Sequence, residues 1–269
     1  MQQKLADKVA VVLGASAQGG CGWAIAEVLA REGCKVVVAA RRETPLRELA
    51  ARIGGTATVC DAGREDQVSE LAATALRAYG SLHIAINAAG APFRSSIADV
   101  TTEVLQSALN VNYFGCVYFV KHMAAAIGAN GSIVLISSMC ATHPVENFAA
   151  YGCAKAATSS LVRYAALEYG GRNIRVNAIL PGPIESSASQ GLFLNREIRG
   201  AFEKEIPLGR IAQPEDIAEA AIWLAGPSFL TGVNLQLNGG NFLQRFPRAE
   251  ELPGGSKAYQ ERPLKRAAI

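Results

Sequence analysis

Hydrophobic residues fall into short continuous runs that alternate with longer amphipathic stretches. The runs predict strands at residues 8–13, 35–39, 56–60, 82–86, 132–136, 174–179 and 233–237. Helical periodicity predicts helices at residues 23–31, 64–79, 102–127, 150–169 and 214–224. Continuous apolar strands that alternate with helices are typical of a parallel sheet covered on both faces. We therefore predict a doubly wound α/β fold, with a seven-stranded parallel sheet and helices on both faces.

The chain shows no internal repeat or linker that would divide this pattern. We therefore predict a single domain over residues 1–240. Residues 241–269 hold three prolines, adjacent glycines and many charges, and they predict a C-terminal tail outside the sheet. Two phenylalanines and a leucine stand early in it, so we expect residues 242–247 to dock beside residues 183–205 or onto a neighbouring subunit. From Glu250 onward we expect a looser segment, the alternative being a plain solvated tail.

Composition excludes several classes of protein. The 269 residues are 50% hydrophobic and 18% charged, which is typical of a globular protein with a large core. A net charge of only +3 favours no nucleic-acid partner. No apolar run has the length of a membrane span, and the first residues lack a signal-peptide core, so we expect a cytoplasmic protein. The six cysteines lack metal-ligand spacing and the three histidines are scattered, which predicts free thiols and no metal site.

A glycine-rich loop, residues 14–22, follows the first predicted strand. Such a loop lets backbone N–H groups approach a pyrophosphate, and a flexible turn is the alternative. The second strand ends in Ala40, Arg41 and Arg42, with no acidic residue to accept hydrogen bonds from the hydroxyl groups of an adenosine ribose. Two guanidiniums attract a 2′-phosphate, so this end favours NADP(H) over NAD(H), unless both arginines are only solvated surface charge.

A second group of residues predicts carbonyl chemistry. Tyr151 and Lys155 are four positions apart on a predicted helix, and therefore share one face. The lysine ammonium is expected to lower the pKa of the phenol. Ser138 follows a buried strand, which places its hydroxyl at the carboxyl end of the sheet. A phenol beside a hydroxyl suits carbonyl reduction, although Tyr and Lys at this spacing also occur by chance.

These motifs, in this order, resemble the short-chain dehydrogenase/reductase family, in its compact single-domain branch. The resemblance covers roughly residues 4–240 and includes Asn87 to Gly90, Asn112, and Pro181 to Ile184. It implies a Rossmann-type sheet, a nicotinamide cofactor and a catalytic tetrad. The tetrad would be Asn112, Ser138, Tyr151 and Lys155.

The resemblance also implies a role for each matching residue. Tyr151 would be the general acid in reduction, Ser138 would hold the substrate oxygen, and Asn112 would support a water that relays protons to Lys155. The cofactor-binding residues would be Gly14, Ser16, Gly20, Cys21, Gly22, Arg41, Arg42, Asp61, Ala62, Asn87, Ala88, Gly90, Tyr151, Lys155, Pro181, Gly182, Ile184 and Ser186. The glycine loop departs from the family pattern by about two extra residues, which leaves open which amides meet the phosphates.

Substrate contacts are expected from three segments, at residues 91–97, 139–150 and 183–205. Their candidate residues are Phe93, Met139, His143, Phe148 and Phe193. This mixture favours a mid-sized apolar or aromatic ketone or secondary alcohol, although several of these side chains would equally well pack the loops.

Two alternatives stay open. A 3-oxoacyl-carrier-protein reductase would need a basic patch at the site mouth, for which Arg94, Arg196 and Arg199 are a thin version. A non-catalytic dinucleotide sensor or scaffold would not need the tetrad. The two long predicted helices carry apolar residues beyond those needed to cover the sheet, and these are Phe114, Tyr118, Leu161, Tyr164, Ala165 and Leu167. Together with the resemblance, they predict a subunit interface and a homotetramer, with a homodimer as the alternative.

Overall fold

The computed structural model describes residues 5–255, which are built around one seven-stranded parallel sheet. The strand order is β3-β2-β1-β4-β5-β6-β7, so the chain reverses direction across the sheet between β1 and β4. The strands are β1 (Val9–Leu13), β2 (Lys35–Ala40), β3 (Thr56–Val59), β4 (Ile84–Asn87), β5 (Gly131–Ile136), β6 (Ile174–Pro181) and β7 (Asn234–Leu237). In open α/β sheets, ligands bind beyond the carboxyl ends of the strands at such a switch point.

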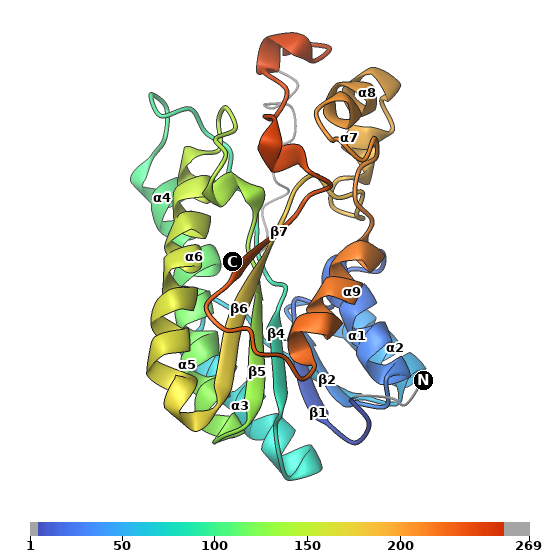
Figure 1. Ribbon diagram of the computed structural model, residues 1–269, viewed down its shortest axis with the longest axis vertical. Coiled ribbons are helices and arrows are strands. Elements are labelled where there is room, and N and C mark those ends of the chain that lie inside the picture. The colour runs from blue at the N-terminus through green and yellow to red at the C-terminus, as the bar shows by residue number, and fades with distance from the viewer. Residues whose placement is uncertain (1–4, 256–269) are drawn as a thin grey trace.

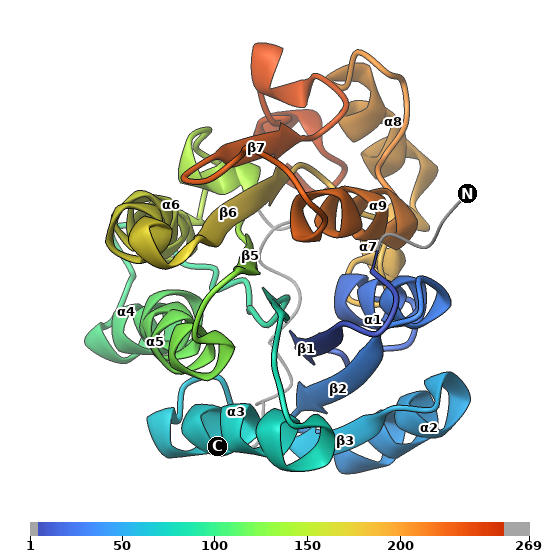
Figure 2. The ribbon, with the colours of Figure 1, turned by 60° about the horizontal axis from the view of Figure 1, so that its bottom comes forward.

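Helices cover both faces of the sheet (Figure 2). One face carries α1 (Cys21–Arg31), α2 (Glu43–Ile53) and α9 (Pro214–Ala225). The other carries α3 (Glu65–Tyr79), α5 (Gly115–Ile127) and α6 (Ala149–Tyr169), with α4 (Thr102–Leu109) beyond the end of α5. Successive residues of a strand point to opposite faces, so Val11 and Val12 of β1 enter different cores, and both are fully buried. The doubly wound fold predicted from the apolar runs is confirmed.

Three helical features differ from the sequence prediction. The predicted helix over residues 102–127 is divided by a π-helical turn, Asn110–Phe114, between α4 and α5. Helix α2 was not predicted, because it buries only Leu46, Leu49 and Ala50 in a charged sequence. Two helices in the segment after β6, α7 (Gln190–Phe193) and α8 (Arg196–Lys204), were also not predicted. They stand beyond the carboxyl end of the sheet (Figure 1).

The tail returns over α8 after β7 instead of leaving the molecule (Figure 1). It forms two short 3-10 turns, Asn241–Leu243 and Ala249–Glu251. Docking beside the segment 183–205 is confirmed for Phe246, which packs against the cluster formed by α7 and α8, whereas Phe242 is 38% exposed. The expectation of a looser chain from Glu250 is wrong as far as Leu252, which is only 4% exposed within that cluster. The rest of the predicted tail, residues 256–269, lies outside the described residues.

Within residues 5–255, no helix combines the length and hydropathy needed to span a lipid bilayer.

Candidate active site

Tyr151 and Lys155 lie one turn apart on α6, on the face that meets the carboxyl end of β5. The Lys155 side chain is buried, and its Nζ donates to the Ile136 carbonyl at 3.0 Å. The same Nζ lies 5.7 Å from the centre of the Tyr151 ring. The helical spacing therefore brings the phenol and the ammonium to one site, as the sequence predicted.

Ser138 reaches the same site from the extended backbone that follows β5. Its hydroxyl accepts from the Cys140 amide at 3.1 Å and interacts with the Tyr151 phenol. Burial raises the pKa of Tyr151 above its ordinary value, the Cys140 thiol adds to the rise, and the Ser138 hydrogen bond opposes it. Burial also lowers the pKa of Lys155. The predicted lowering of the phenol pKa by Lys155 is therefore not seen, because desolvation of the phenolate outweighs it.

Asn112 lies in the π-helical turn and is completely buried. Its amide Nδ2 donates to the Ala91 carbonyl at 3.0 Å, and its Oδ1 accepts from the Ala91 amide at 3.3 Å. Gly90 lies between Asn112 and Lys155, because a Cβ placed on Gly90 would be 3.1 Å from Asn112 Oδ1 and 3.2 Å from Lys155 Nζ. The fourth member of the predicted tetrad thus joins the other three through the loop after β4.

The glycine loop folds tightly between β1 and α1. Gly14 has a φ of +93°, and a Cβ on it would lie 2.5 Å from the Ala89 amide nitrogen. A Cβ on Gly22 would lie 2.4 Å from the Gly14 carbonyl oxygen. Both positions therefore need glycine, since Gly14 packs against the backbone of the loop after β4 and Gly22 of α1 packs against the backbone of Gly14. Gly20 is the N-cap of α1, and the pKa of the following Cys21 thiol is raised to about 11 by burial.

A cavity of about 360 Å³ opens beside this loop, over the carboxyl ends of β1, β2 and β4. Arg42 spans part of it: its Nε donates to Ser16 Oγ at 3.2 Å and its Nη2 to the Ser16 carbonyl at 2.9 Å. The lining of the cavity includes the predicted cofactor residues Gly14, Ser16, Arg41, Arg42, Asp61, Ala62, Ala88 and Gly90. The cavity offers two guanidiniums as hydrogen-bond donors, and its small lining residues leave room for a ligand. Both features fit the adenosine half of a dinucleotide.

Two predicted cofactor residues act on the backbone of this cavity. Asp61 Oδ1 accepts from the Gly63 amide at 2.9 Å, which fixes the turn after β3. Asn87 is 1% exposed, and its Oδ1 accepts from the Ala89 amide at 2.9 Å. Asn87 was expected to contact the cofactor, but it does not line the cavity. Its side chain instead holds the backbone of the loop after β4.

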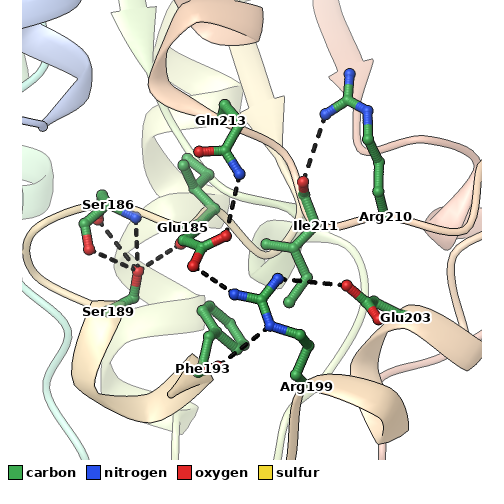
Figure 3. Close-up of polar contacts among 10 residues, drawn as sticks. Glu185, Ser186, Ser189, Phe193, Arg199, Glu203, Arg210, Ile211 and Gln213 are labelled. Atoms are coloured by element: carbon green, nitrogen blue, oxygen red, sulfur yellow. Dashed lines mark hydrogen bonds and ion pairs between the residues drawn. The ribbon is translucent and has the colours of Figure 1, made fainter. Parts of the chain in front are cut away.

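The segment after β6 faces the glycine loop, since the Ser187 amide donates to the Gly19 carbonyl at 3.0 Å. Pro181 is the last residue of β6. A Cβ on the next residue, Gly182, would lie 2.8 Å from the Cβ of Asn238, which follows β7. Ser189 Oγ donates a hydrogen bond to the Ile184 carbonyl. Ser186 Oγ lies 3.2 Å from Ser189 Oγ (Figure 3). Ser189 thus organises the segment that holds Ile184 and Ser186, a role the sequence analysis missed.

Glu185 and Arg199 form an ion pair within this segment (Figure 3). Gln213 Nε2 also donates to Glu185 at 3.1 Å, and Arg199 Nε donates to the Phe193 carbonyl at 3.2 Å. The Arg199 guanidinium, and then Gln213, hold the pKa of Glu185 below its usual value. No sequence pattern indicates this pairing, because the two residues are fourteen positions apart across a loop.

The five predicted substrate residues are not all at the site. Phe148 is, with its ring edge-on to Tyr151 at a centroid distance of 6.1 Å. Phe93 lines the cavity beside the glycine loop, and His143 Nδ1 lies 3.0 Å from the Thr142 hydroxyl. Met139 is fully buried and Phe193 is 4% exposed, so these two predicted contacts are corrected. Both side chains point into cores, a direction that position in the loop did not reveal.

Cys140 is a residue of this site that the sequence analysis did not single out. It lies two positions after Ser138, and its thiol interacts with the Ser138 hydroxyl and raises the pKa of Tyr151. Over residues 5–255, no group of three or more His, Cys, Asp or Glu side chains is arranged to hold a metal ion.

Comparison with known proteins decides the family. The family model described as Enoyl-(Acyl carrier protein) reductase matches residues 14–241, which span the glycine loop and all the site residues above. The chain belongs to the short-chain dehydrogenase/reductase family. Its members are oxidoreductases that use nicotinamide dinucleotides, so this protein is an enzyme of that class.

Several relatives are similar over most of their length. Dehydrogenase/reductase SDR family member 4 of Homo sapiens is 34% identical over 246 residues, which cover 88% of each chain. The 3beta-hydroxysteroid dehydrogenase 1 of Eggerthella lenta is 34% identical over 253 residues, 89% of this chain and 95% of its own. Among solved structures, a short-chain type dehydrogenase/reductase from Mycobacterium ulcerans superposes with a TM-score of 0.88 at 28% identity, covering 96% of this chain and 99% of the other.

Proposed function

We propose that this enzyme is an NADP(H)-dependent reductase of ketones, acting in reverse on secondary alcohols, whose substrates are mid-sized and apolar or aromatic. The observation that carries the proposal is the meeting of Ser138, Tyr151 and Lys155 at the carboxyl end of β5. The aromatic ring of Phe148 against Tyr151 favours an apolar group beside the reacting carbon. The similarity to a hydroxysteroid dehydrogenase supports the same substrate class.

The side chains divide the chemistry among them. Ser138 would donate a hydrogen bond to the carbonyl oxygen and hold it beside the phenol. Tyr151 would then transfer its proton to that oxygen, because burial keeps the phenol protonated at neutral pH. Lys155, held by the Ile136 carbonyl, would hold the nicotinamide ribose and stabilise the phenolate that remains. When bound, the nicotinamide supplies the hydride to the carbonyl carbon.

Cofactor preference rests on Arg41 and Arg42. Both line the cavity beside the glycine loop, and β2 ends at Ala40, without the acidic residue that would accept from a ribose 2′-hydroxyl. A carboxylate there would repel a 2′-phosphate, whereas a guanidinium pairs with it. We therefore propose NADP(H) as the cofactor.

The 3-oxoacyl-carrier-protein reductase is the second candidate, and the family model described as Enoyl-(Acyl carrier protein) reductase is compatible with it, since both activities take a substrate bound to an acyl carrier protein. Such an enzyme needs unpaired cations for an acidic carrier. Arg199, one of three candidates for that patch, is instead paired with Glu185 and Glu203. A non-catalytic sensor is less consistent with the site, since it has no need for a phenol placed between Ser138 and Lys155.

A substrate panel tests the proposal. Ketones, steroids, oxoacyl thioesters and sugars are offered to the purified enzyme with NADPH or NADH, and oxidation of the nicotinamide is followed by absorbance. Faster turnover of apolar ketones with NADPH is the expected result. Turnover of oxoacyl thioesters alone would select the second candidate, and dinucleotide binding without turnover of any substrate would select the sensor.

A further inference from the structure

The end of β7 directs the chain toward α8. Gly239 and Gly240 have φ values of +62° and +87°, and a Cβ on Gly240 would lie 2.9 Å from Pro207 Cγ. The Leu208 amide donates to the Gly239 carbonyl at 3.1 Å. The two glycines therefore turn the chain against the residues that follow α8, where no other residue type would fit without strain.

Asn241 then fixes the start of the tail. It is 1% exposed, and its Nδ2 donates to the Glu205 carbonyl at 2.8 Å and to the Arg245 carbonyl at 3.0 Å. One buried side chain thus joins the end of α8 to the tail. Loss of these bonds would leave the buried Glu205 carbonyl without its donor, which is costly in a protein interior.

Arg245 closes the tail on itself and on α8. Its two terminal nitrogens lie 2.6 and 2.7 Å from the Glu251 carboxylate, and Nη2 lies 3.2 Å from the carboxylate of Glu205. The Glu205 side chain is 11% exposed, so its charge has little access to water and depends on this partner. The Arg245 guanidinium, and then the Arg248 amide, lower the pKa of Glu251 to about 2.

Apolar contacts continue this attachment toward the reacting groups. Ala249 and Leu252 are 3% and 4% exposed, and they form one buried cluster with Ile198 and Phe202 of α8. Phe148 packs against the same cluster. Because Phe148 also contacts Tyr151, a continuous path of contacts runs from Leu252 to the phenol.

We propose that residues 241–252, which we call the C-terminal strap, hold α8 against the Phe148 side of the candidate active site, where the apolar part of a ketone would lie, and that Arg245 is a positioning residue for α8. The strap holds α8 at its end through Asn241 and Arg245, while the Glu185–Arg199 pair holds its beginning (Figure 3). The strap thereby sets how much room is left for the apolar part of the substrate that lies beyond the carbonyl. This role rests on the proposed reduction of apolar ketones.

Two matched pairs of variants test the strap in the full-length enzyme. Leu252→Ala removes a buried side chain of the strap, whereas Leu243→Ala removes one that is 70% exposed in the same segment. Arg245→Ala removes the contacts to Glu205 and Glu251, whereas Arg248→Ala removes only an exposed pair at 3.7 Å. Light scattering on each variant checks that the oligomeric state is unchanged.

The expected effect is on KM for bulky ketones. KM should rise about fivefold in Arg245→Ala, as for loss of a partly exposed ion pair, and roughly tenfold or more in Leu252→Ala, as for loss of a buried leucine. Small ketones that do not reach α8 should be affected less. The affinity for NADPH and kcat should stay at the wild-type values, and Arg245→Lys should restore part of the loss.

Hydrogen exchange of the α8 amides gives a readout that does not depend on activity. Exchange should be faster in Leu252→Ala and Arg245→Ala, and unchanged in Leu243→Ala and Arg248→Ala. If α8 exchanges at the wild-type rate in both strap variants, the proposal is overturned. An enzyme that reduces no ketone, yet shows the faster exchange, would refute the proposed substrate class while leaving the attachment of α8 to the strap established.

Discussion

Arg42 is joined to Ser16 by two hydrogen bonds, from Nε to the hydroxyl at 3.2 Å and from Nη2 to the carbonyl at 2.9 Å. The basic end of β2 and the glycine loop are therefore connected before any dinucleotide enters. This connection orients the Arg42 guanidinium over the cavity, which Arg41 also lines, and both residues are exposed to solvent. Preorganised charge of this kind reduces the entropy lost on binding.

The first prediction follows for cofactor choice. NADPH should bind at least tenfold more tightly than NADH, a difference of about 1.4 kcal/mol. Arg41→Ala and Arg42→Ala should each reduce that preference, because each removes a charge from the 2′-phosphate site. Titration calorimetry measures both affinities, with Arg47→Ala as the control, since Arg47 is exposed and pairs only with Glu43. Equal affinities for the two dinucleotides in the wild type would contradict the prediction.

A second prediction concerns the phenol. Tyr151→Phe keeps the ring contact with Phe148 but removes the proton donor, so turnover should fall by roughly 10² to 10⁴-fold. NADPH affinity should be unchanged. The matched control is Tyr164→Phe, the same substitution at a residue of α6 that is 64% exposed. Turnover of Tyr151→Phe within tenfold of the wild type would assign the acid to another residue.

The pH dependence of the two directions should differ. Burial raises the pKa of Tyr151 above 10.0, so the protonated phenol needed for reduction persists through neutral pH. Reduction should therefore be nearly constant between about pH 6 and about pH 9. Alcohol oxidation needs the phenolate, and its kcat/KM should rise about tenfold per pH unit over that range. A reduction rate that falls across neutral pH would show that the pKa of Tyr151 during catalysis lies lower than burial alone implies, as expected if the Lys155 ammonium dominates.

Assembly is the subject of the fourth prediction. On the outer face of α6, Tyr164 and Leu167 are 64% and 81% exposed, and Phe114 at the start of α5 is 42% exposed. Apolar surface of this kind is typical of an interface, and we expect a homotetramer with two-fold axes, or else a homodimer. Leu167→Glu should lower the mass measured by light scattering, whereas Val59→Glu at the far edge of the sheet should not. A wild-type monomer at micromolar concentration would refute the interface.

The parts of the fold and of the candidate site that depend on local sequence patterns were predictable, and those that depend on contacts between distant residues were not. Most of the strands were predictable because they are continuous apolar runs, although β3 and β7 alternate apolar with polar residues. The meeting of Tyr151 with Lys155 was predictable because helical spacing alone decides it. Met139 and Phe193 were misplaced because the direction of a loop side chain depends on packing partners distant in sequence. Ala165, expected at an interface, is 3% exposed in the core for the same reason. The partners of Leu252 and the pairing of Arg199 with Glu185 likewise come from contacts across loops, which no local pattern encodes.

The contact between Gly14 and Gly22 limits how this enzyme can be redesigned. A Cβ on either residue would overlap backbone atoms, at 2.5 Å for Gly14 and 2.4 Å for Gly22. No side-chain adjustment relieves a clash with backbone, so a library that randomises these positions would return mostly misfolded protein. Attempts to exchange the cofactor should therefore diversify the end of β2 at residues 40–42 and leave the two glycines untouched.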